Sequence, residues 1–143
     1  MSASTGAGSL REIHCRVPAD ADRLAETRHA LNRWASGIGM PGQQREELVL
    51  ATYEAMANSV EHAYVDAAGD DLDGVVDLHA ARTPDGTIIV TVTDYGRWKP
   101  PVPSDGIRGR GILLMRALAD DTTITRVDTG TTVTMTWTLP PHN

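Results

Sequence analysis

The most informative stretch of this chain is EAMANSVEHAY, which spans residues 54–64 of 143. It lies in a longer segment that opens at Pro41 and has helical periodicity, so we expect a helix from there to about Tyr64. Glu54 and Asn58 are four residues apart, which places their side chains on one face, about one turn apart. A carboxylate and a neutral amide so placed can act as a general base and a Mg²⁺ ligand. A solvated helix face has the same spacing, so this pair alone leaves both readings open.

The expected helix has two different sides on a helical wheel. The first side has an obvious use in packing and carries Leu48, Thr52, Met56, Ser59, Val60 and Ala63. The second side carries Glu47, Ala51, Glu54, Asn58 and Glu61, with His62 at its margin. We expect the first side to face the core and the second, carboxylate-amide side to be the functional one.

The flanking sequence predicts the remaining elements. Asp20 is placed to cap a helix that Gly37 and Gly39 close. The other patterns predict strands at 10–17, 75–81 and 87–93, a turn at 84–86, a loop at 97–108, a short helix at 112–118 and a hairpin within 122–138. The resulting order, β-α-α-β-β-loop-α-β-β, indicates an α+β fold: a two-layer sandwich with helices on one face of a mostly antiparallel sheet. We expect residues 1–9 to be a disordered tail and residues 10–143 to form one domain.

Composition excludes several classes of protein. The formal net charge is −6 and aromatic residues make up only 4%, with no Phe, which disfavours direct nucleic-acid binding. A single cysteine, Cys15, cannot form an internal disulfide. No apolar run approaches the roughly 20 residues of a membrane span, and no secretory signal is present. We therefore expect a cytoplasmic protein without a membrane partner, whose core is built from Val, Leu, Ile, Ala and Met.

Three further short motifs have possible functional uses. Asp94-Tyr95-Gly96 follows a β-branched strand, and an aspartate there can accept a hydrogen bond from a ligand amine, although Asp-x-Gly is also a common turn. Gly109-Arg110-Gly111 precedes a short helix, where free backbone N–H groups suit a phosphate, or where the glycines simply end a flexible loop. Gly130-Thr131-Thr132 enters the last strand, where a threonine hydroxyl could reach a ligand or could reflect β-propensity alone.

The order and spacing of these motifs are more specific than any one of them. Together they resemble the Bergerat-fold, histidine-kinase-like ATPases, a superfamily that includes gyrase and the histidine kinases. The chain is most similar to the bacterial anti-sigma factor and serine-protein kinase family, over about residues 10–139. The run Glu-Ala-x-x-Asn-x-x-x-His-x-Tyr from residue 54 carries much of the likeness, as does Gly-Arg-Trp-Lys-Pro-Pro from residue 96 followed by Arg-Gly-Arg-Gly from residue 108. The short, Pro-rich segment between them favours this branch over the sensor kinases.

The resemblance implies a role for each matching residue. Glu54 would be the general base, and Asn58 would hold Mg²⁺ against the phosphates of ATP. Asp94 would recognise the adenine amino group, with Gly96 letting the base approach the backbone. Residues 97–108 would form the ATP lid. The remaining nucleotide-binding residues would be His62, Arg108, Gly109, Arg110 and Gly111, with Thr132 and possibly Thr131 lining the adenine side.

The resemblance also implies a function. The protein would be an anti-sigma factor and an ATP- and Mg²⁺-dependent serine/threonine kinase in stress-response control of transcription. It would phosphorylate a STAS-domain antagonist and in the alternate complex sequester a sigma factor, as a homodimer. The alternatives are an ATP-binding module that sequesters a partner without catalysis, and a protein of this fold whose pocket holds no nucleotide.

Overall fold

The computed structural model describes residues 11–60, 74–95, 114–127 and 130–139. The expectations for the tail at 1–9, the helix end at 61–64 and the loop at 97–108 lie outside these residues. The described elements are β1 (Glu12–Pro18), α2 (Ala21–Gly37), α3 (Gly42–Asn58), β2 (Val75–Arg82), β3 (Thr87–Asp94), β4 (Asp121–Val127) and β5 (Gly130–Thr138). Residues 114–118 are also helical. The element order expected from the sequence is confirmed.

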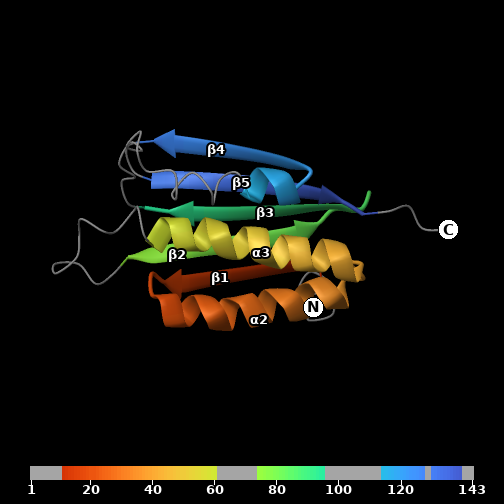
Figure 1. The fold of residues 1–143 in the computed structure, drawn as a ribbon, viewed down its shortest axis with the longest axis horizontal. Helices are drawn as coiled ribbons and strands as arrows, with labels where there is room; N and C mark the ends of the chain where they lie inside the picture. Colours follow the sequence, from red (N-terminus) through yellow and green to blue (C-terminus); the bar gives the residue numbers. More distant parts are fainter. Residues whose placement is uncertain (1–10, 61–73, 96–113, 128–129, 140–143) are drawn as a thin grey trace, which may run out of the picture.

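The five strands form one sheet in the order β1-β2-β3-β5-β4, and every neighbouring pair is antiparallel. Helices α2 and α3 lie side by side over one face of this sheet, and the helical segment 114–118 lies on the same side (Figure 1). The expected α+β sandwich is therefore confirmed. Helix α3 packs against α2, β3 and β5, which places its C-terminal end close to the middle of the sheet.

Helix α2 begins and ends where the sequence predicts. The Asp20 side chain accepts a hydrogen bond from the backbone N–H of Asp22 at 2.9 Å, which satisfies one of the free donors at the helix start. Leu24, Leu31 and other apolar side chains are buried along one face. Just beyond the helix, Gly39 adopts a φ of 84°, a conformation that glycine accepts without strain.

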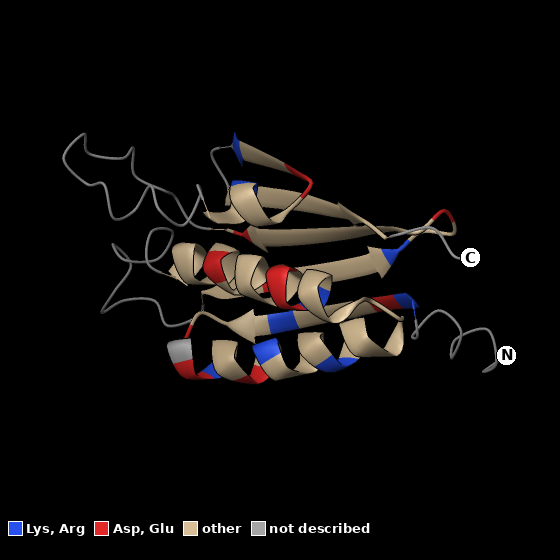
Figure 2. Ribbon diagram, turned by 45° about the vertical axis from the view of Figure 1, so that its right-hand side comes forward, with Lys and Arg blue, Asp and Glu red and all other residues tan. Residues whose placement is uncertain are grey.

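Helix α3 is buried over a wider arc than the wheel suggested. Leu48, Thr52 and Met56 are buried as expected, but Ala51 and Asn58 from the opposite side are buried too. The expectation that the first side faces the core is therefore confirmed, and part of the second side is covered as well. The reason is that α3 touches both the sheet and α2, so two neighbours cover it instead of one. Charged residues of both signs remain accessible on α3 and on α2 (Figure 2).

The two faces of the sheet differ sharply in chemistry. Strict alternation places apolar residues of β2, β3 and β5 under the helices, where they are buried: Val76, Leu78, Ala80, Ile88, Val90, Val92, Val133 and Met135. The other face, called here the outer face, is rich in threonine: Thr91, Thr93, Thr123, Thr125, Thr132, Thr134 and Thr136. Among the described residues, the core contains the aliphatic residues expected from composition and Trp137, with Trp34 and Tyr53 packed against it.

Trp137 is anchored by its indole nitrogen. The side chain is 1% exposed, and Nε1 donates a hydrogen bond to the Leu118 carbonyl oxygen at 3.1 Å. This contact ties the end of the helical segment 114–118 to β5.

In the described part of the chain, no helix is long and apolar enough to cross a membrane.

Replacing Trp137 by Phe should lower the free energy of unfolding by about 2–3 kcal/mol, because it removes buried volume and leaves the Leu118 carbonyl without its donor. Trp34→Phe is the matched control, since the buried Trp34 Nε1 has no hydrogen-bond partner among the residues that the structure describes. That control should cost less than about 1 kcal/mol. Urea unfolding curves measure the free energy of unfolding of both variants. Equal losses would contradict the stabilising role of the Trp137 hydrogen bond.

Candidate functional site

The candidate site is centred on a buried carboxylate at the end of β3. Asp94 is the last residue of the strand and is only 1% exposed. The hydroxyl of Ser59 donates a hydrogen bond to Asp94 Oδ2 at 2.9 Å. Ser59 directly follows α3, so this contact joins the end of the helix to the end of the central strand. Residues 59 and 60 continue α3 as a wider, π-helical turn, a feature that often marks functional sites.

Asn58 lies beside this contact and has an incompletely bonded side chain. It is 7% exposed, and its Nδ2 has no hydrogen-bond partner within the described residues. Buried polar groups are nearly always bonded, so an exception indicates a group that a ligand or ion completes. The two ends of an amide are assigned from their hydrogen bonds, so rotation of the group can present either the NH₂ donor or the oxygen acceptor.

The residues present fit a magnesium ion in their donor chemistry. Mg²⁺ prefers oxygen ligands, uses few from the protein and keeps water and substrate phosphates as the others. The Asn58 amide can supply one such oxygen. Glu54 is one turn earlier on α3, partly exposed, and supplies a carboxylate. Among the described residues no group of three or more His, Cys, Asp or Glu side chains could hold a metal without a substrate.

Strand β5 approaches Asp94 from the other side through a glycine. A Cβ atom added at Gly130 would lie 2.0 Å from the Asp94 carbonyl oxygen and 3.1 Å from Tyr95 Cα, so no other residue fits without moving the backbone. The next residue, Thr131, is in register with Asp94 and is 3% exposed. The glycine therefore brings the buried Thr131 next to the aspartate.

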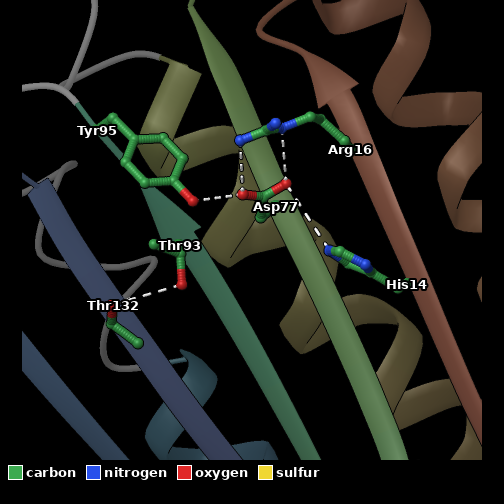
Figure 3. A network of polar contacts seen from close by, with 6 residues as sticks. All are labelled: His14, Arg16, Asp77, Thr93, Tyr95 and Thr132. Atoms are coloured by element: carbon green, nitrogen blue, oxygen red, sulfur yellow. Dashed lines mark hydrogen bonds and ion pairs between the residues drawn. The ribbon is translucent and has the colours of Figure 1, made fainter.

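The adjacent threonine faces the opposite way. Thr132 is in register with Thr93, and their hydroxyl oxygens are 3.4 Å apart on the outer face (Figure 3). Of the two threonines, Thr131 is the one on the helix-covered face with Asp94. The remaining site residues expected from the sequence lie outside the described residues: His62, Gly96, Arg108, Gly109, Arg110 and Gly111.

Sequence reasoning missed two residues of this region. Ser59 falls on the apolar side of the helical wheel, and its small hydroxyl among apolar neighbours was the available signal. Tyr95 had drawn attention only as the middle residue of the Asp94-Tyr95-Gly96 motif. Its hydroxyl donates a hydrogen bond to Asp77 on the outer face (Figure 3). The hydrogen bond to Asp77 raises the pKa of the Tyr95 phenol above its ordinary value.

This combination of fold and site agrees with comparison to known proteins. Residues 17–137 match the family of the histidine kinase-like ATPase domain. The chain belongs to this family. It is 29% identical to the serine-protein kinase RsbW of Oceanobacillus iheyensis over 122 residues, which cover 78% of this chain and 77% of that protein. It is 27% identical to the serine-protein kinase RsbW of Bacillus velezensis over 142 residues, covering 90% and 86%.

A solved structure shows the same likeness. The RsbU and RsbW domains of Rv1364c from Mycobacterium tuberculosis superimpose with a TM-score of 0.72 and 27% identity. The match covers 90% of this chain and 32% of that longer chain. The protein is thus an RsbW-like histidine kinase-like ATPase domain, with distant serine-protein kinase homologues over most of its length. Membership of this ATPase family implies ATP binding.

The close approach at Gly130 yields a direct prediction. Gly130→Ala should lower the free energy of unfolding by about 2 kcal/mol or more, because the added methyl group overlaps the Asp94 backbone. Gly37→Ala serves as the control, since a Cβ there meets nothing within 4 Å and alanine favours the helix. Chemical unfolding of both variants tests this, and a Gly130→Ala variant as stable as the Gly37→Ala variant would refute the close packing.

Proposed function

We propose that this protein is an anti-sigma factor with ATP- and Mg²⁺-dependent serine/threonine kinase activity. Its protein substrate would be a STAS-domain antagonist, and a sigma factor would be its alternate partner, bound by a homodimer. The observation that carries the proposal is the buried Asp94 carboxylate, joined by Ser59 to the end of α3, where Asn58 has an amide atom without a partner in the described residues. The serine-protein kinase activity named for both RsbW relatives supports it.

Each described residue has a definite task in this proposal. Asp94 accepts a hydrogen bond from the adenine amino group, and its burial favours selectivity for a ligand that carries such a donor. Thr131 lines the adenine beside it. Asn58 would hold Mg²⁺, which supplies neutralisation of the phosphate charge when bound.

Glu54 is assigned the proton transfer. The hydroxyl of the acceptor serine or threonine attacks the γ-phosphorus and loses its proton to the Glu54 carboxylate. The new oxygen–phosphorus bond forms as the bond between the γ-phosphorus and the β–γ bridging oxygen breaks, and ADP leaves. Phosphoryl transfer asks the protein mainly for positioning and charge compensation, so a small set of residues is sufficient.

Glu54→Ala should reduce phosphate transfer by about 10²–10⁴-fold while ATP affinity stays close to that of the parent protein, because a general base acts only in the chemical step. Radiolabel transfer from ATP to the cognate antagonist measures the first quantity, and titration calorimetry the second. A parent protein that binds ATP and the sigma factor but transfers no phosphate would support the non-catalytic module instead. Glu47→Ala, two helical turns before the assigned base on the same side of α3, is the control.

Asn58→Ala tests the metal assignment. Adding Mg²⁺ should tighten ATP binding to the parent protein, and the variant should lose about tenfold or more of that gain because its side chain offers no ligand oxygen. Calorimetric titrations with and without Mg²⁺ give the comparison. If Mg²⁺ tightens ATP binding equally in the variant, Asn58 is not a metal ligand. If the parent protein does not bind ATP, the alternative of a fold whose pocket holds no nucleotide is supported.

A further inference from the structure

The outer face of the sheet carries a polar network centred on Asp77 of β2 (Figure 3). In strand register, Asp77 lies between Arg16 on β1 and Thr93 on β3. Arg16 contacts both carboxylate oxygens, with Nε 3.2 Å from Oδ1 and Nη2 donating to Oδ2 at 3.4 Å. His14 Nε2 is 3.9 Å from Oδ1, and the Tyr95 hydroxyl donates to Oδ2. The carboxylate is thus held by two residues of β1 and by the residue that follows β3.

Tyr95 links this network to the candidate nucleotide site. Asp94 pairs with Val76 and Thr131 in the last register position at that end of β3. Ends of strands are where local opening is easiest, because no further ladder bonds follow. Tyr95 is the first residue beyond that position. Its hydroxyl reaches back to Asp77, the third residue of the neighbouring strand β2. The bond therefore closes the end of the strand.

Three contacts from different directions restrain the Asp94 segment. Ser59 holds the carboxylate on the helix-covered face, and Gly130 presses against the backbone from β5. Asp77 holds Tyr95, the residue after Asp94, from the outer face. We propose that Tyr95 and Asp77 are positioning residues, whose hydrogen bond on the outer face keeps the Asp94 carboxylate aligned with the adenine amine. This inference rests on the proposed function, in which Asp94 accepts that amine.

Tyr95 is half-exposed, so the strength of its hydrogen bond depends on the chemistry of the acceptor. A hydrogen bond to a carboxylate is stronger than one between neutral groups, and Asp77 is only 16% exposed at its side chain. The raised pKa of Tyr95 means that the phenol keeps its proton at all pH values below the ordinary phenol pKa of about 10. The donor is lost only as pH rises through the still higher pKa of the folded state, so the phenol proton is present throughout the physiological range.

Tyr95→Phe removes only the hydroxyl and is the decisive variant. It should weaken ATP binding about three- to tenfold, in line with loss of one charge-assisted hydrogen bond that acts through alignment. Binding of inosine triphosphate, which has an oxygen where ATP has the amino group, should change less, because it makes no such bond to Asp94. The dissociation constant for inosine triphosphate divided by that for ATP should therefore fall, whereas the melting temperature of the protein should stay nearly constant. Titration calorimetry with both nucleotides and thermal melting provide these quantities.

A double-mutant cycle identifies the pair. Asp77→Asn should reproduce part of the loss of ATP affinity, because the amide removes the charge that strengthens the bond, and it should cause no further loss when Tyr95 is already Phe. Tyr53→Phe is the control for the phenol, since that ring lies on α3 against Arg28. Glu12→Gln is the control for the carboxylate, since its partner on the outer face is His79. Both controls should bind ATP like the parent protein.

The outcomes separate the two proposals. If the parent protein binds ATP and Tyr95→Phe has the same ATP affinity and the same preference for ATP over inosine triphosphate, the positioning role is wrong. The proposed function is unaffected by that result. Equal losses for ATP and inosine triphosphate, together with a lower melting temperature, also overturn the positioning role, because they show a general structural effect. Failure of the parent protein to bind ATP overturns the proposed function itself. If Asp77→Asn does not fold, Tyr95→Phe with its control decides alone.

Discussion

The buried carboxylate of Asp94 is the constraint on which the rest of the site depends. Removing a charged or polar group from water costs several kcal/mol unless a partner replaces the solvent. Ser59 provides such a partner, and to do so the end of α3 must lie over the end of β3. Gly130 must lack a side chain for β5 to approach from the other side. One buried acidic group thus meets the end of a helix and the start of a neighbouring strand.

The alternation of the central strands gives the sheet two separate uses. Side chains directed toward the helices build an apolar core that ends in Asp94 and Thr131. Side chains directed away form a surface of threonines with a charged network at one corner. Successive residues of a strand point to opposite faces, so Asp94 and Tyr95 connect these two surfaces through a single peptide unit. A restraint on the outer face can therefore act on the site beneath the helices.

Much of the fold could be predicted from local pattern. The Asp20 cap, the glycines after α2 and the alternation in β2 are local signals, and the structure has each of them where it was expected. The burial of Ala51 could not be foreseen, because it depends on α2 packing beside α3. The orientation of Tyr95 depends in the same way on a contact with a residue of another strand.

The sequence by itself determined the order of helices and strands, the two chemically different faces of each strand and the spacing of Glu54 and Asn58, because these follow from periodicities of a few residues. Only the tertiary structure decided which distant residues meet. Ser59 contacts Asp94 across 35 positions, and Tyr95 contacts Asp77 across 18. Such contacts depend on strand order and register, which are set by the packing of the whole sheet against its helices and not by any local stretch.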